Sequence, residues 1–211
     1  MTAPLRQPTA PTTKEIGAEE DGAARLLAAA LRQFVEKGFH GTSMRDIARE
    51  AGASVSHAYY YFPSKGAILY RLVADVTAAL ANELEAVDRS SGPDPAARLV
   101  AVVRAHVLFH TARQAESFVG NTELRSLSEA ERAAVVADRD RVTRSFRRPI
   151  DAGVATGQFD CAAPAETTRA IVSMTTAVAS WHRPDGPLTP AEIADRYAAI
   201  ALRMVGAPTL S

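Results

Sequence analysis

The stretch TSMRDIAREAGASVSHAYYYFPSK, from Thr42 to Lys65, predicts two short helices joined by a tight turn. The first helix carries small apolar residues at positions i, i+3, i+4 and i+7, which form one buried stripe: Met44, Ile47, Ala48 and Ala51. Ser43 and Asp46 have the spacing of a capping box and mark the start of this helix. Gly52 stands where the end of the helix requires a left-handed residue.

The second short helix starts after Ser54, whose side chain is suited to cap it. Ala58 and Phe62 are four residues apart and face inward. The remaining side chains point largely outward and form a small, polar and aromatic face: Val55, Ser56, His57, Tyr60 and Tyr61. Two helices in this order, with a glycine in the turn, form the helix-turn-helix pattern, whose second helix lies in the major groove of DNA.

From Gly38 to Lys65 the sequence resembles the DNA-binding segment of the TetR family of bacterial transcriptional repressors. The matching positions are Thr42, Ser43, Ile47, Ala48, Ala51, Gly52, Ser54, Tyr59, Tyr60, Phe62 and Lys65. Four positions depart from the usual residues of the family, namely Ser56, His57, Ala58 and Gly66. These departures concern the operator sequence and not the fold.

Several residues of this segment are candidates for DNA contact. Arg45 lies on the exposed face of the first helix, where a guanidinium can fork onto guanine, and a surface salt bridge is the alternative. Val55, Ser56 and His57 would meet base edges, although His57 could touch phosphate only. The resemblance implies these phosphate contacts: Ser43, Ser54, Tyr59, Tyr60 and Lys65. For Tyr59, packing in the core is an equal alternative.

The composition is that of an ordinary globular chain of 211 residues, with 47% hydrophobic and 23% charged residues. Its formal net charge is zero, which argues against indiscriminate nucleic-acid binding, so the indication for DNA comes from position and not from composition. The single cysteine, Cys161, suits a reducing compartment, and no apolar run of about 18 residues is present to span a membrane. The expected location is cytoplasmic.

The fold predicted for the whole chain is all-α, with about nine helices. Residues 1–18 are expected to be a disordered arm, residues 19–66 a three-helix DNA-binding head, and residues 67–211 a larger helical body for ligand binding and dimerisation. Besides the two short helices, the expected helices cover residues 19–37, 64–88, 96–113, 115–124, 128–156, 165–182 and 189–205. Pro149 is expected to kink or split the longest of them.

A ligand cavity is predicted between the central helices of the body, where Phe109, Phe118 and Phe146 would contact an acyl chain. His106 and His110 are four residues apart and could hold a metal, but no third ligand completes the set, so we expect them to line the cavity or an interface. Arg144 and Arg148 would bind an anionic headgroup at its rim, and a solvated, salt-bridged face is the alternative for these arginines. The sequence contains no phosphate loop, nucleophile elbow or metalloprotease motif, so we expect neither an enzyme nor a cofactor.

The TetR resemblance also implies a homodimer in which the last two helices of each subunit pair as a four-helix interface. The residues predicted for this interface are Ile171, Met174, Val178, Trp181, Ile193, Tyr197, Ile200 and Met204. The body resembles regulators linked to fatty-acid, steroid or aromatic-acid catabolism. The predicted function is therefore a ligand-responsive repressor that binds a pseudo-palindromic operator and is released by a small hydrophobic or acyl-CoA-type effector. The alternative is a helical protein that binds a small molecule or a partner without binding DNA.

Overall fold

The computed structural model describes residues 13–207, and side chains from residue 21 onward. These residues form ten α-helices and one 3-10 helix, without a strand. Counting the short α9 as the end of the interrupted α8 gives the nine helices predicted, and the all-α fold class is confirmed. The described residues fall into two compact units, one that ends at Ile68 and one that begins at Leu69. None of the described helices is both long and apolar enough to cross a membrane.

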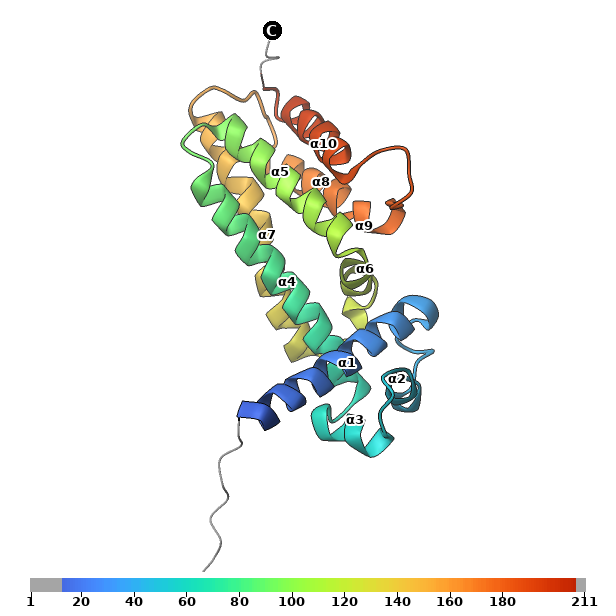
Figure 1. Ribbon diagram of the computed structural model, residues 1–211. Helices are drawn as coiled ribbons and strands as arrows, with labels where there is room; N and C mark the ends of the chain where they lie inside the picture. Colours follow the sequence, from blue (N-terminus) through green and yellow to red (C-terminus); the bar gives the residue numbers. More distant parts are fainter. Residues whose placement is uncertain (1–12, 208–211) are drawn as a thin grey trace, which may run out of the picture. The chain divides into compact units, whose positions relative to one another are not determined.

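The first unit consists of α1 (Thr13–Lys37), α2 (Met44–Glu50), α3 (Val55–Tyr61) and the first residues of α4 (Figure 1). α1 begins six residues before the predicted start at Glu19, because the stretch contains helix formers such as glutamate, lysine and alanine. Residues 1–12 of the predicted arm lie outside the described residues. The buried side chains of this unit come from all four helices: Leu26, Ala29, Ala30, Phe34, Met44, Ile47, Ala48, Ala58, Phe62 and Ile68.

The turn between α2 and α3 has the geometry that the sequence predicts. Gly52 adopts φ +65°, in the left-handed region that L side chains disfavour. Ser43 closes a capping box at the start of α2, since its Oγ accepts from the backbone N–H of Asp46 and the Asp46 carboxylate accepts from the Ser43 N–H at 3.0 Å. These local contacts set the direction of α2 and of the turn that leads to α3.

The second unit is a helical body. Its elements are α4 (Lys65–Ser90), α5 (Pro95–Ala112), α6 (Gln114–Thr122), the 3-10 helix η1 (Leu124–Ser126), α7 (Glu129–Ala155), α8 (Pro164–Thr176), α9 (Val178–Trp181) and α10 (Pro190–Met204). α5 is central, because it packs against α7, α8 and α10 (Figure 1). The largest buried side chains of the core include Leu84, Leu99, Phe146, Ile150 and Ile171.

α7 runs through Pro149 as one helix, so of the two outcomes expected for this proline the split does not occur. Pro149 has no N–H, and the Ser145 carbonyl therefore lacks its usual helical donor. Both residues are buried, and the helix is held by packing around them. The predicted helix over residues 165–182 is, in contrast, interrupted at Ala177 between α8 and α9.

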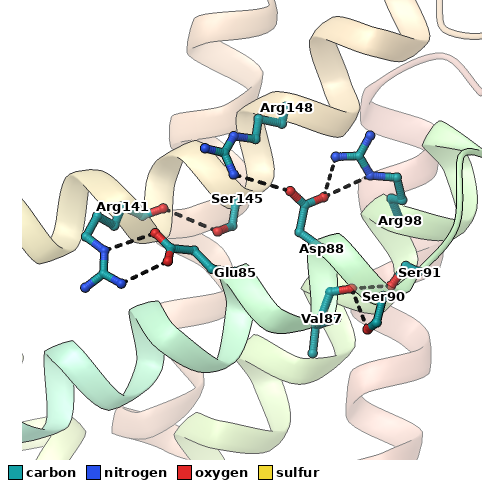
Figure 2. Close-up of polar contacts among 9 residues, drawn as sticks. All are labelled: Glu85, Val87, Asp88, Ser90, Ser91, Arg98, Arg141, Ser145 and Arg148. Atoms are coloured by element: carbon teal, nitrogen blue, oxygen red, sulfur yellow. Dashed lines mark hydrogen bonds and ion pairs between the residues drawn. The ribbon is translucent and has the colours of Figure 1, made fainter.

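Ion pairs join α4 to α5 and α7 at the end of α4 (Figure 2). The Asp88 side chain is 2% exposed and its Oδ1 accepts from Arg98 Nε at 2.9 Å and Nη2 at 2.7 Å. On α7, Arg141 donates to both carboxylate oxygens of Glu85, which lowers the pKa of that carboxyl. These contacts fix the three long helices of the body against one another.

Candidate DNA-binding interface and ligand cavity

α3 presents a polar and aromatic face because its other side is packed inside the first unit. Ser54 caps the helix, with its Oγ accepting from the backbone N–H of His57 at 3.1 Å. Ala58 is fully buried and faces the core of the unit. The residues left in contact with solvent are the exposed Ser56, His57, Tyr59 and Tyr60 and the half-buried Val55. Tyr59 is 51% exposed, which decides against the alternative that its ring packs in the core.

Three aromatic side chains on α3 contact one another and limit the rotamers of this face. The His57 ring lies edge-on to Tyr61 at 4.9 Å between centroids, and Tyr60 lies edge-on to Tyr61 at 5.2 Å. Tyr61 was expected to point outward, yet it is half-buried against α1, where a Cβ on Gly22 would come within 2.5 Å of its hydroxyl. The close approach to a glycine of another helix is a tertiary contact that periodicity does not reveal.

The two arginines of α2 differ in their surroundings. Arg49 Nη2 forms an ion pair with Asp46 Oδ1 at 2.8 Å. Arg45 is exposed, and no carboxylate of the described residues forms an ion pair with it. The surface salt bridge considered for Arg45 is therefore made by Arg49 instead, which leaves the Arg45 guanidinium available for an outside partner.

The Lys65 side chain is bound to backbone carbonyls of its own unit. Its Nζ donates to the backbone carbonyls of Phe39 and Thr42, both at 2.6 Å, and lies 4.3 Å from the centroid of the Phe39 ring. These bonds connect the start of α4 to the turn between α1 and α2. Lys65 therefore stabilises the first unit, a role that the sequence did not indicate.

A cavity of about 230 Å³ lies inside the second unit and contains three of the predicted ligand residues, His106, Phe109 and His110. Its apolar walls come from several helices, among them Val76, Leu80, Phe109, Val142 and Val172. Phe146 is fully buried beside it, with its ring edge-on to His106 at 5.1 Å, and belongs to the core. Phe118 lies instead in a neighbouring groove of about 400 Å³ between α6, α8 and α9.

His106 and His110 form a buried pair in which the two Nε2 atoms are 3.2 Å apart. Burial, with a smaller effect of the Arg139 charge, lowers the pKa of His110 from 6.5 to about 4. Burial and then the neighbouring His110 lower the pKa of His106 well below 6.5. Both imidazoles are therefore neutral at pH 7. Over the part of the chain that the structure describes, no group of three or more potential ligands could hold a metal ion.

The arginine of the cavity is Arg139 and not one of the two that the sequence suggested. Arg144 and Arg148 lie on the exposed side of α7, and Arg148 Nη1 is 3.7 Å from Asp88 Oδ2 (Figure 2). Arg139 lines the cavity and donates from Nη2 to the Gly120 carbonyl at 2.7 Å. A signal for it existed, because Arg139 falls three and seven residues before the buried Val142 and Phe146, on the apolar stripe of α7.

The residues predicted for the dimer interface divide between two sides of their helices. Ile171, Val178 and Ile193 are at most 2% exposed and pack into the core of the same subunit, so these three assignments are corrected. They form the stripe that faces α5 and the inner core, because α8 and α10 each need one apolar side inside their own subunit. The half-buried members are Met174, Tyr197 and Met204, and the exposed ones are Trp181 at 45% and Ile200 at 39%.

A capped two-helix motif with an exposed polar and aromatic second helix, followed by an all-helical body that encloses a cavity, defines a ligand-binding regulator of the helix-turn-helix class. Comparison with known proteins identifies the family. Residues 26–72 match the bacterial regulatory proteins of the tetR family, and residues 92–205 match the C-terminal domain described as tetracyclin repressor-like. The chain belongs to the TetR family.

Individual relatives agree with this assignment. The HTH-type transcriptional repressor KstR2 of Mycobacterium tuberculosis is 28% identical over 180 residues, which cover 84% of this chain and 89% of that protein. A bacterial regulatory protein of the tetR family from Rhodococcus RHA1 superposes with a TM-score of 0.84 at 33% identity, over 89% of this chain and 98% of that one. AibR, solved in complex with isovaleryl coenzyme A and operator DNA, shares the fold at 20% identity. Its TM-score is 0.78, over 89% of this chain and 100% of that one.

The protein is accordingly a transcriptional repressor of the TetR family that binds operator DNA, and not an enzyme. The alternative of a helical binding protein without DNA is excluded by the family.

Proposed function

We propose that the protein acts as a homodimer, reads a pseudo-palindromic operator with two copies of α3, and is released when a small effector with an apolar part occupies the cavity. The observation that carries the DNA-binding role is the open face of α3, whose opposite side is packed by Ala58 and Phe62. Because operator DNA is the target, we expect the protein in the cytoplasm.

On the operator, side chains near the start of α3 would meet base edges, with Val55 against a thymine methyl and His57 against an acceptor such as guanine N7. Arg45 would fork onto a guanine from α2. Ser56, beside Val55 and His57, is a further candidate for a base edge. Hydroxyl groups would bind phosphates and fix the register, and the candidates for these phosphate contacts are Ser43, Ser54, Tyr59 and Tyr60. Lys65 would act mainly through the two carbonyls that it holds.

The DNA-binding proposal is tested by fluorescence anisotropy with pseudo-palindromic duplexes whose half-site centres are about one helical turn apart or a multiple of it. We expect Arg45→Ala to weaken binding by about 1–3 kcal/mol and to relax preference at one base position. Arg49→Ala is the matched control, because this neighbouring arginine is already paired with Asp46. If Arg45→Ala weakened all sequences equally, or no more than Arg49→Ala, Arg45 would read no base.

A homodimer is supported by apolar side chains that the subunit leaves open on α9 and α10. Trp181 and Ile200 are exposed, and the Trp181 ring stacks on Tyr197 with 6.3 Å between centroids. Aromatic side chains of this kind anchor protein interfaces. In sedimentation experiments we expect the Trp181→Asp/Ile200→Asp double variant to be monomeric. A variant that stayed dimeric would locate the interface elsewhere.

The effector proposal rests on the cavity between α4, α5, α6, α7 and α8. The two classes considered for the effector are a small hydrophobic molecule and the acyl part of an acyl-CoA thioester. An effector of lipid or acyl type is supported by two proteins of the same fold, one described as the ketosteroid transcriptional regulator KstR2 and the other, AibR, solved with isovaleryl coenzyme A. Such a ligand releases the operator only if it binds one conformation of the dimer more tightly than the other. Titration of acyl-CoA thioesters and free acids against the operator complex tests this, and release by neither class would contradict it.

A further inference from the structure

The ligand cavity is lined by buried polar atoms that have no hydrogen-bond partner within the part of the chain that the structure describes. These atoms are Nδ1 of His106, Nδ1 of His110 and Oγ of Ser117, and all three residues line the cavity. Each side chain is at most 4% exposed. Buried polar groups are normally hydrogen-bonded, and leaving one unpaired costs about 1–3 kcal/mol. Three such atoms around one cavity indicate that a polar group of a ligand completes the site.

The histidine pair supplies one definite donor to this site. Since both imidazoles are neutral, the hydrogen bond between the Nε2 atoms requires one Nε2–H and one Nε2 lone pair. The ring that accepts through Nε2 must carry its proton on Nδ1. In either tautomeric arrangement the pair therefore has one free Nδ1–H donor and one free Nδ1 acceptor.

Arg139 gives the site its charge. It is the one charged residue among the described residues that line the cavity, and no carboxylate of those residues forms an ion pair with it. Burial lowers the pKa of its guanidinium, and the acceptor that it has among the described residues is the Gly120 carbonyl. A partly buried guanidinium without a carboxylate is stabilised by an anionic ligand, and its planar fork matches the oxygens of a carboxylate or of a phosphate.

We infer that the effector is a small apolar monocarboxylic acid, bound through its carboxylate to Arg139, Ser117 and the His106–His110 pair. This inference rests on the proposed regulatory function and specifies its ligand. One carboxylate can accept from the guanidinium, from the free Nδ1–H and from the Ser117 hydroxyl at the same time. The other Nδ1 of the pair is an acceptor, and a carboxylate does not pair it. An alcohol, ketone or amide can accept from the same neutral donors but leaves the Arg139 charge uncompensated.

The size of the cavity agrees with a free acid. A cavity of about 150 Å³ accepts benzene, so about 230 Å³ suits a ligand of roughly nine non-hydrogen atoms. The coenzyme A part of a thioester is several times larger and would have to remain outside. A thioester also lacks the carboxylate that the buried donors require.

The inference is tested by calorimetry of the full-length protein with hexanoate, octanoate and phenylacetate, each compared with its primary amide and its coenzyme A thioester. We expect the acids to bind at least about 10-fold more tightly than their amides, and Arg139→Gln to lower acid affinity by about 10- to 100-fold. Arg144→Gln is the matched control, because it removes an exposed arginine of the same helix that does not line the cavity. We expect it to leave acid affinity unchanged.

A second variant keeps the test decisive if Arg139→Gln fails to fold. Ser117→Ala removes an unpaired buried hydroxyl, so its melting temperature should equal or exceed that of the unsubstituted protein, while its acid affinity falls about 3- to 10-fold. Amides that bind as tightly as acids, absence of binding by all three acids, or acid affinity unaltered in both variants would overturn the inference. Operator binding of the ligand-free protein is measured separately. If only the thioesters released the protein from the operator, the carboxylic-acid assignment would be refuted and the regulatory function would stand. Loss of operator binding itself would instead refute the regulatory function.

Discussion

Acidification from pH 7 to pH 5 is expected to destabilise the second unit through the buried His110. Burial and then the Arg139 charge lower the pKa of this histidine from 6.5 to about 4 in the folded protein. Between these two values the unfolded chain binds more protons than the folded chain. The free energy of unfolding therefore falls as the pH falls from about 6.5 toward 4.

The magnitude follows from the two pKa values. At 1.36 kcal/mol for each tenfold change in proton concentration, the destabilisation due to His110 is close to zero at pH 7 and about 2 kcal/mol at pH 5. The full effect, about 3 kcal/mol, is reached only below pH 4. His106 acts in the same direction, because burial lowers its pKa as well.

The assay is equilibrium urea unfolding at both pH values, followed by the fluorescence of Trp181, which is the only tryptophan and lies in the same unit. The unsubstituted protein is compared with His110→Gln, and His57→Gln, which removes an exposed histidine of the other unit, is the control. Protein concentration is held constant, because dissociation of a dimer shifts apparent stability. We expect the unsubstituted protein to lose about 2 kcal/mol more than His110→Gln between pH 7 and pH 5. Equal losses would refute the argument that burial keeps this imidazole neutral.

Three further substitutions test the contacts that hold each unit. Ser43→Ala removes the capping box of α2 and should destabilise the first unit by about 1 kcal/mol in thermal unfolding followed by circular dichroism, whereas an unchanged midpoint would contradict the role of the cap. Asp88→Ala leaves Arg98 without its buried partner and should cost about 3–5 kcal/mol, while the control Asp75→Ala, from an exposed pair, should cost less than about 1 kcal/mol in the same urea titration. Similar costs for both would show that burial of the Asp88 carboxylate is unimportant. Phe146→Ala should cost about 3–5 kcal/mol as a cavity-forming substitution, and a loss below about 1 kcal/mol would mean that the core refills the space.

The sequence alone determined the helices and the motif. Their signals are local: the apolar spacing of Met44, Ile47 and Ala48 along α2, the capping pair Ser43 and Asp46, and the glycine at the turn all act within a few residues. The same reasoning located the breaks between most helices of the body. It also identified the family, because the helix-turn-helix motif combines a short turn with fixed residue types.

Tertiary structure alone decided whether a given side of each body helix faces the core, the cavity or the surface of the subunit. Ile171 and Trp181 are both apolar residues of the α8–α9 segment, yet one is fully buried in its own subunit and the other is 45% exposed. On α7, Arg144 and Arg139 carry the same guanidinium, and only Arg139 reaches the cavity. The physical reason is that periodicity defines a helix face relative to the helix itself, whereas the neighbour of that face depends on packing between segments far apart in the chain.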